Sequence, residues 1–440
     1  MNSRALTAAM FVAVVVICQP FAAVAQSTCS PDACMPEMSC DMGMSCGCCA
    51  QACCCPGFRC ANDITGTALN SKPFRWFQTN CLARRKITVG GWVDQGVSFA
   101  DCRPSDRFNG PVTYNDRDRE YQMNQLWFFL ERKTNTRCGG FDIGGRIDTL
   151  FGSDARFIES SDGLEANWHQ DQRFYGGAVP QFYVDAAYNR VTVRTGHFLS
   201  PLSYEDVRAP KNFFYSHSYT RQYAEPTTFT GLLGMFDLSD RLRLSSGFHR
   251  GWNKFDDTDG NDRINVLAMA EWTSWDCMRQ FKFGFSSGEE EPGNNTTLYT
   301  LIGKLCFSPL LNYAVQFDYG QSTGGLTQRV RYAEWTSLVQ YFNYKYSNNW
   351  ALGTRIEWFR DKQGTRVHGL GIGNMAYGSY PGDFFEISLG LNWQPSRNVM
   401  IRPEVRWDWF DKHGHGDSYP YDAGGRRNQF MGACDLIVSF

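Results

Sequence analysis

After residue 86 the chain alternates between apolar and polar residues, and this period of two constrains the fold more than any other feature. The stretch IRPEVRWDWF has an apolar row and a charged row, namely Ile401, Val405, Trp407 and Trp409 against Arg402, Glu404, Arg406 and Asp408. Successive side chains of a β-strand point to opposite faces, so this alternation predicts strands. We expect sixteen strands and no helical domain, at about residues 86–99, 121–132, 139–151, 179–188, 191–196, 228–237, 242–251, 264–273, 280–286, 298–307, 311–319, 333–346, 350–360, 384–394, 399–410 and 428–440.

The links between these strands are alternately short and long. Short links fall near residues 134, 189, 238, 274, 308, 347 and 395, and long links begin near residues 100, 152, 197, 252, 287, 320, 361 and 411. Tight turns at one end and long loops at the other are typical of a transmembrane β-barrel, whose turns face the periplasm. The sequence therefore predicts an all-β, antiparallel up-and-down barrel over residues 86–440, with both termini periplasmic.

A soluble β-sandwich is the alternative fold, because its strands also alternate between a core face and a water face. Sixteen strands are too many for one ordinary sandwich, and a Greek key would break the alternation of turns and loops. Aromatic residues also gather near strand ends, as at Trp350 and Trp358, where the girdles of a membrane barrel lie. These features favour the barrel.

The first 25 residues are typical of a secretory signal peptide. Arg4 precedes an apolar run from Ala5 to Ile17, and Ala23-Val24-Ala25 forms a small-residue cleavage site. No later apolar run is long enough for a spanning helix. Export without a helical anchor indicates the outer membrane of a diderm bacterium, with its lipid and its assembly machinery as partners. A net charge of -2 gives no basic field for nucleic acid.

Residues 26–60 have a composition of their own, with ten cysteines between Cys29 and Cys60. An even cysteine count in an exported protein fits a set of disulfides whose pairing the sequence does not reveal. A soft-metal site is the alternative, because thiolates and nearby methionines suit Cu(I) or Zn(II). The spacing fits no standard zinc pattern, which favours disulfides. Residues 61–85 are expected to form a linker.

The chain ends in NQFMGACDLIVSF, an alternating strand that stops on an aromatic residue. This end resembles the last strand of outer-membrane barrels, which commonly finishes on an aromatic residue that the insertion machinery reads. By that resemblance Phe440 is expected to be an assembly signal.

A more specific resemblance lies between residues 196 and 252. It is carried by Gly196, Ser203-Tyr204-Glu205, Asn212-Phe213-Phe214-Tyr215-Ser216-His217-Ser218, Glu225-Pro226, Thr230-Gly231 and Gly251-Trp252. This segment resembles the putative β-barrel porin-2 family, the OmpL-like outer-membrane proteins. The rest of residues 86–440 shares only the general strand pattern, and the cysteine-rich segment lies outside the resemblance. It implies a channel-forming barrel without established catalytic residues.

Motifs for catalysis or for metal binding are weak. The sequence has no G-x-S-x-G elbow, so we expect neither an enzyme nor a cofactor. His413 and His415 in DKHGHGD are candidate metal ligands without a supporting motif. The acidic stretch DDTDGNDR, residues 256–263, lacks the closing bidentate Glu of a calcium loop. Solvated loops explain both stretches.

The longest expected loop, residues 197–227, contains an aromatic cluster and a charged set. The aromatic cluster, Phe213, Phe214, Tyr215, Tyr219 and Tyr223, would be costly to expose to water as one patch. We therefore expect the loop to fold into the barrel, with its charged residues lining a pore constriction: Glu205, Asp206, Arg208, Lys211, Arg221 and Glu225. The alternative is that the aromatic residues cap the barrel from outside.

The predicted function is passive diffusion of small hydrophilic solutes, because a barrel of sixteen strands leaves an aqueous channel. The lumen-facing residues would include Asp142, Arg146, Asp148, Arg355, Glu357, Arg402, Glu404, Arg406 and Asp408. This mixture of charges indicates a transverse field rather than a strong ion filter. A non-conducting barrel that serves as a receptor or envelope anchor is the alternative. Porins of this size are often trimers, and by that analogy a homotrimer is a candidate assembly. Ser246 is then a candidate interface position, and a lipid-facing position near the membrane interface is the alternative.

Overall fold

The computed structural model describes residues 75–136, 140–165, 168, 174–256, 263–324, 331–367, 369–370, 376–377, 379–413 and 419–440. The chain divides into two units, Met1–Ala50 and Gln51–Phe440. The expected signal peptide, the cysteine-rich segment and most of the linker lie outside the described residues. Their assignments stay predictions.

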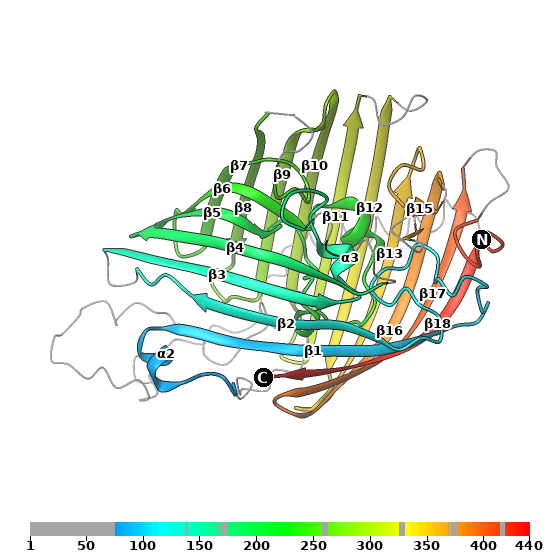
Figure 1. Ribbon diagram of the computed structural model, residues 1–440, viewed down its shortest axis with the longest axis horizontal. Helices are drawn as coiled ribbons and strands as arrows, with labels where there is room; N and C mark the ends of the chain where they lie inside the picture. Colours follow the sequence, from blue (N-terminus) through cyan, green and yellow to red (C-terminus); the bar gives the residue numbers. More distant parts are fainter. Residues whose placement is uncertain are drawn as a thin grey trace, which may run out of the picture. The chain divides into compact units, whose positions relative to one another are not determined.

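Sixteen strands form one closed antiparallel barrel (Figure 1). Each strand pairs with its neighbours along the chain, and β1 pairs with β18 to close the barrel. The strands are β1 (Ile87–Ala100), β2 (Gln122–Arg132), β3 (Phe141–Gly152), β4 (Gly176–Tyr188), β5 (Val191–Leu199), β6 (Thr228–Asp237), β7 (Leu242–His249), β8 (Asn265–Thr273), β9 (Arg279–Glu291), β10 (Asn294–Cys306), β11 (Leu311–Thr323), β12 (Tyr332–Lys345), β13 (Trp350–Asp361), β16 (Gly382–Ser396), β17 (Val399–Lys412) and β18 (Asn428–Ser439). The predicted fold class is confirmed, and each expected strand is present.

One expected link is wrong. A long loop is expected from about residue 287, but β9 continues to Glu291 and β10 starts at Asn294. Only Pro292 and Gly293 connect them, with Gly293 at φ +80° as a tight turn requires. The end of this hairpin is polar on both faces, so it has no alternation to mark it as strand. A second difference is a short hairpin between β13 and β16, made of β14 (Gly369–Leu370) and β15 (Ala376–Tyr377).

Helices are short in the described part of the chain, and none of those described is long and apolar enough to cross a membrane. They are α2 (Asn80–Arg84), α3 (Ala155–Ile158), the 3₁₀ turn η2 (Ala209–Lys211) and the π-helical turn η3 (Thr220–Ala224). Thr79 caps α2, with its Oγ1 accepting from the Leu82 amide at 3.3 Å. The described end of the expected linker is therefore partly helical.

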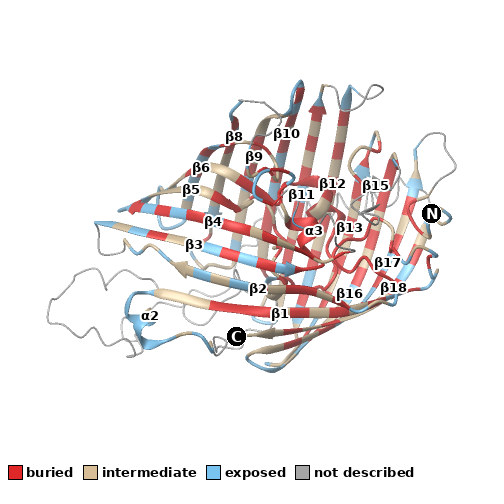
Figure 2. Cartoon of the chain, in the orientation of Figure 1, coloured by how far each residue is buried: buried red, intermediate tan, exposed pale blue. Residues whose placement is uncertain are grey.

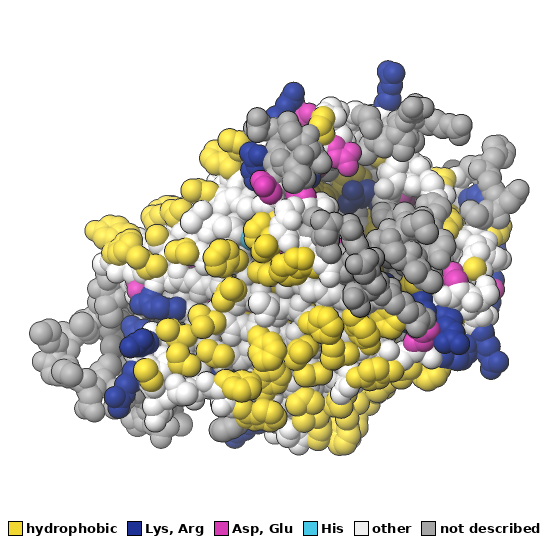
Figure 3. Space-filling view, in the orientation of Figure 1, with side chains coloured by type: hydrophobic (Ala, Val, Ile, Leu, Met, Phe, Trp, Pro, Cys, Tyr) yellow, Lys and Arg dark blue, Asp and Glu magenta, His cyan; other side chains and the backbone are white. Residues whose placement is uncertain are grey.

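The barrel is apolar outside and polar inside, the reverse of a soluble fold. Burial alternates along each strand (Figure 2). Large apolar side chains such as Phe182, Phe248 and Leu352 are exposed, whereas Asp148 and Arg355 are buried. In Figure 3 the hydrophobic side chains cover the middle of the visible face and the charged ones lie at its ends. This distribution is the one that a lipid bilayer selects.

Aromatic pairs lie at both ends of the strands. Trp350 and Trp393 stack at 5.3 Å near one end of β13 and β16. Phe385 and Trp409 stack at 5.1 Å near the other end of β16. Phe385 and Trp393 are eight residues apart, roughly 26 Å along a strand. This separation suits the two aromatic girdles of a membrane barrel.

The chain terminus completes the seam between β18 and β1. The Gly91 amide donates to the Phe440 carbonyl at 3.0 Å, and the Phe440 amide donates to the Gly91 carbonyl at 2.9 Å. The Phe440 ring contacts Trp76, Phe77 and Phe128, with centroids 5.3 to 6.0 Å apart. A side chain at Gly91 would clash with this ring and with the backbone of β2.

Candidate pore and its internal loop

The link between β5 and β6, residues 200–227, lies inside the barrel, and we call it the internal loop. Its backbone amides donate to two glutamates on the inner face. Tyr215 and Ser216 donate to Glu404 Oε2 at 3.0 Å each. Tyr219 and Thr220 donate to Glu357 at 2.8 and 2.6 Å. These bonds satisfy buried backbone groups that have no secondary-structure partner.

Three buried arginines bind the carbonyl groups of the same loop. Arg402 Nη1 lies 2.9 to 3.0 Å from three carbonyl oxygens, those of Ala209, Asn212 and Phe214. Arg355 Nη1 donates to the Ser216 carbonyl at 2.8 Å. Arg406 Nη1 donates to the His217 carbonyl at 2.6 Å. A guanidinium carries five donors, so it can bind the loop and a carboxylate together.

Each of these arginines is also paired with a carboxylate on the barrel wall. Arg355 Nε lies 2.9 Å from Glu386, Arg402 Nε lies 3.0 Å from Asp435, and Arg406 Nη2 lies 2.8 Å from Asp408. All six side chains are buried. The inner faces of β13, β16, β17 and β18 thus form an anchoring wall whose charges neutralise one another and hold the loop.

Inward-facing glycines receive the aromatic residues of the loop. A Cβ at Gly390 would lie 2.9 Å from the Phe214 ring, and one at Gly96 would lie 2.7 Å from the Tyr215 ring. At Gly353 a Cβ would overlap the Phe213 ring. Glycine inside a strand often marks a close approach of another group. These three glycines are therefore sockets for Phe213, Phe214 and Tyr215.

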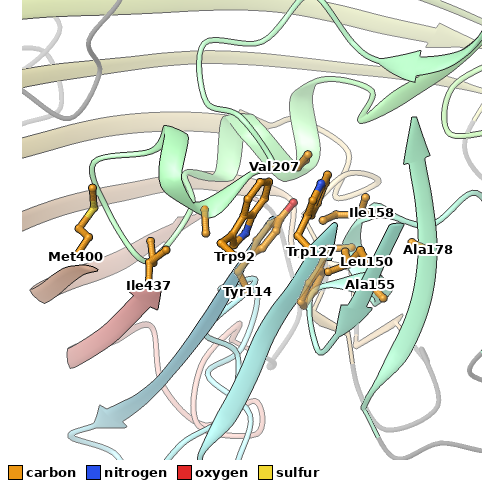
Figure 4. Close-up of a cluster of buried hydrophobic side chains, with 12 residues drawn as sticks. Trp92, Tyr114, Trp127, Leu150, Ala155, Ile158, Ala178, Val207, Met400 and Ile437 are labelled. Atoms are coloured by element: carbon orange, nitrogen blue, oxygen red, sulfur yellow. The ribbon is translucent and has the colours of Figure 1, made fainter. Parts of the chain in front are cut away.

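The loop is also held on its β1–β2 side. Val207 lies beside Trp92 and Trp127 in a buried apolar cluster (Figure 4). Gln125 Nε2 donates to the Val207 carbonyl at 2.7 Å, and Gln125 Oε1 accepts from the Ala209 amide at 3.1 Å. Side chains from opposite ends of the barrel sequence therefore converge on one segment.

Burial and neighbours shift the pKa values of acidic groups in the loop. Burial by itself would raise the pKa of Glu205, but the Arg355 charge and a hydrogen bond from His217 hold that pKa well below its usual range. Burial raises the pKa of Glu225 to about 8, and the Arg221 charge only partly offsets it. Glu205 is therefore ionised at neutral pH, while Glu225 is mostly protonated.

A pocket of about 430 Å³ lies between the loop and the opposite side of the barrel. Its wall is formed by residues of β2 to β5 and β10, which we call the passage wall. Five of the six residues expected at the constriction line this pocket: Glu205, Asp206, Arg208, Lys211 and Arg221. Glu225 is not among its lining residues and instead accepts from Gln316 Nε2 at 2.7 Å.

The expected lumen-facing residues fall into two groups. Arg146 lines the pocket, with its Nε 2.6 Å from Asp148, while Asp142 pairs with Arg132 near the β2–β3 turn. The other group is on the inner face but under the loop: Arg355, Glu357, Arg402, Glu404, Arg406 and Asp408. These six charges bind the loop or one another.

Several residues of the site were not singled out from the sequence. Arg194 and Lys304 line the pocket from β5 and β10, and Glu386 completes the anchoring wall. Arg194 and Glu386 alternate with outward apolar neighbours, so the period of two predicts that they face the lumen. It does not predict that they line a pocket or hold the loop. The inward glycines could have predicted a packing site, because an isolated glycine weakens a strand and often marks the place where another group approaches closely.

The candidate metal motifs gain no support from the described residues. His413 Nε2 lies 3.0 Å from Asp383, as an ion pair or hydrogen bond. His415 lies outside the described residues, as does most of the stretch 256–263. No group of three or more metal-ligating side chains occurs among the residues that the structure describes.

Known structures share this fold. The chain is similar to an anion-selective porin from Comamonas acidovorans, with a TM-score of 0.54 and 11% identity over 80% of this chain and 99% of that one. It is also similar to the outer-membrane channel DcaP of Acinetobacter baumannii, with a TM-score of 0.51 and 11% identity over 83% of this chain and 100% of that one. Identities this low show a shared fold alone. No curated protein sequence matches the chain.

The family assignment rests on the sequence of the barrel itself. The model described as "Putative beta-barrel porin-2, OmpL-like" matches residues 86–440, the whole expected barrel and the bulk of the chain. The resemblance noted between residues 196 and 252 is thereby confirmed. The chain belongs to this OmpL-like family of β-barrel porins.

Proposed function

We propose that this protein is a porin through which small hydrophilic solutes diffuse, with the internal loop as the constriction of its pore. The family and the barrel indicate the outer membrane of a Gram-negative bacterium and a general porin role. Proteins of this porin family and fold are typically non-enzymatic. The observation that carries the finer proposal is that the loop is bound to the anchoring wall and to Gln125 of β2 but leaves a pocket of about 430 Å³ along the passage wall.

The attachment of the loop supports a fixed constriction rather than a mobile lid. Its backbone is bound by Glu357, Glu404 and three arginines, and its rings sit in glycine sockets. Releasing it would leave several buried charges without partners, which is costly. The solute path is therefore bounded by the loop residues Arg208 and Lys211 and by the passage wall.

The pocket lies toward the short-turn side of the barrel. Glu131 and Arg146 flank the β2–β3 turn, and Tyr183 and Arg194 flank the β4–β5 turn. Short turns face the periplasm in barrels of this class. We propose that this pocket is the periplasmic side of the constriction and that Phe440 lies on the same side.

A non-conducting barrel that acts as a receptor or envelope anchor is the second candidate. The observation in its favour is the burial of most residues between 202 and 227, together with an apolar cluster of Leu202, Phe229 and Leu233 inside the barrel. These residues fill much of the lumen and narrow any path for a solute through the barrel. The two candidates differ in whether the folded barrel carries current.

Single-channel recording in a planar bilayer is the test. We expect steady ohmic steps from the wild-type protein, and a higher conductance after deletion of residues 206–218. Because this deletion uncovers buried arginines, Lys211→Trp is the milder variant, and its bulk in the pocket should lower the conductance. Arg241→Trp, on the exposed β6–β7 turn, is the matched control and should leave it unchanged.

Heat-modifiable mobility on gels establishes that each variant is folded. A folded wild-type barrel without current would overturn the porin function in favour of the second candidate. If the barrel conducts and its conductance is unchanged by both the deletion and Lys211→Trp, the internal loop does not constrict the path.

A further inference from the structure

We infer that the passage prefers small anions over small cations, so that anionic solutes are the class this barrel admits best; this inference rests on the proposed porin function. Six basic side chains line the pocket: Arg146, Arg194, Arg208, Lys211, Arg221 and Lys304. Three acidic side chains line it: Glu131, Glu205 and Asp206. The inner face as a whole carries both signs of charge and does not predict this excess. The excess arises because the loop covers the anchoring wall and leaves the passage wall beside the pocket.

The three acidic residues of the pocket are already engaged by basic groups. Asp206 accepts from Arg208 Nε at 2.8 Å, and Glu131 lies 3.3 Å from Arg146 Nη1. Glu205 lies 3.2 Å from Arg355 Nη1 and 3.0 Å from His217 Nδ1. Carboxylates held in such pairs attract a passing cation weakly, since their field is largely cancelled.

Two cations of the pocket are less well compensated. Lys304 makes no ion pair with any residue that the structure describes, and its ammonium lies 5.5 Å from the centre of the Tyr204 ring. Arg221 is buried, and neither its Nε nor its Nη1 has a hydrogen-bond partner in the described chain. The acidic group paired with it, Glu225, lies 3.6 Å away and has a pKa raised to about 8, so it is mostly neutral at pH 7.

The acidic residues of the anchoring wall do not offset this excess. Glu357, Glu386 and Glu404 lie under the loop and are hydrogen-bonded to it or to Arg355. The loop therefore separates these three carboxylates from the pocket, and the buried carboxylates of the passage wall, Asp148 and Asp185, are paired with Arg146 and Arg194. In a narrow path with protein walls, a local excess of one charge raises the concentration of ions of the opposite sign.

The test is the reversal potential of the reconstituted full-length protein under a tenfold KCl gradient at pH 7. We expect chloride to permeate about threefold better than potassium, or more. Lys304→Glu should reverse this preference, and Lys304→Gln should reduce it. Arg241→Glu makes the same change of charge on the exposed β6–β7 turn and should have little effect.

The outcomes separate this inference from the function on which it rests. A conducting wild-type channel that prefers potassium or has no preference overturns the inference and leaves the porin function standing. Equal loss of chloride preference in Lys304→Glu and Arg241→Glu also overturns it, because the pocket would then have no special part. A folded barrel without current overturns both.

Discussion

The anchoring wall and the passage wall of the barrel carry the same kinds of charged residue and use them differently. On the anchoring wall Arg402 and Asp435 are almost completely buried, with exposed fractions of 2% and 0%. On the passage wall the corresponding pair, Arg194 and Asp185, keeps 22% and 13% exposed. Both pairs are formed by inward residues of adjacent strands. The difference is that the internal loop covers the first pair and leaves the second beside the pocket.

An inward position therefore does not by itself make a residue part of a pore. The loop has many backbone groups outside any helix or sheet, and each needs a partner once it is buried. Arginines and glutamates of the anchoring wall supply many of those partners, and Gln125 and Gln316 supply others. In the proposed pore the charge of these residues is unavailable to solutes, so the wall that the loop leaves uncovered would decide the chemistry of the path.

Both walls belong to one closed barrel, and Phe440 lies at the seam that closes it. A change at this residue should therefore have the largest effect on the protein. Phe440→Asp should reduce the amount of folded protein in the outer membrane severalfold, because it removes the proposed assembly signal and the ring that contacts Trp76 and Phe77. Quantitative heat-modifiable gels of outer-membrane fractions measure the amount. Phe430→Asp places the same charge on an exposed outward position of β18 as the control. Equal amounts of folded Phe440→Asp and wild type would contradict the prediction.

Removing one arginine from each wall tests the comparison directly. Arg402→Ala should cost about 3–5 kcal/mol of stability, because it strands Asp435 and three loop carbonyls in a buried site. Arg194→Ala should cost about 1 kcal/mol or less, since water reaches both partners of its pair. Reversible urea unfolding in lipid vesicles provides both values. Similar losses for the two variants would mean that the walls are not energetically distinct.

The sequence predicted the fold better than the site, for a physical reason. Lipid and water select opposite side chains along each spanning strand, so the sixteen strands could be read from local alternation. The tip of the β9–β10 hairpin was missed because SSGEEE and NNTT have no apolar side. Contacts of the site depend on distant pairing, as between Tyr215 and Glu404, which are 189 residues apart. Local patterns carry no information about such pairs.

The glycine sockets give a test of the anchoring wall that leaves its charges in place. Gly353→Leu should displace the Phe213 ring and destabilise the protein by about 1–3 kcal/mol, as overpacking does. The loosened loop should also make single-channel current noisier. Combining it with Phe213→Ala should restore part of the stability, which a double-mutant cycle would register as coupling. Gly432→Leu is the control, because a Cβ there meets no atom within 4 Å. Additive losses in the double mutant would show that ring and socket do not interact.

The smallest expected effect concerns the charge at the edge of the passage, and it depends on pH. Burial raises the pKa of Glu225 to about 8, so this group is mostly neutral at pH 7 and becomes negative as the pH rises above 8. The charged neighbours that face it are Arg221 and Lys282, which favour its ionisation, and Asp318, which opposes it. Because a new negative charge beside Arg221 cancels part of its field, chloride preference in the wild type should fall between pH 7 and pH 9.5. Glu225→Gln cannot ionise, so its chloride preference should fall less than that of the wild type over the same range. Reversal potentials at the two pH values compare them, and a parallel fall in both proteins would assign the titration to another group of the passage.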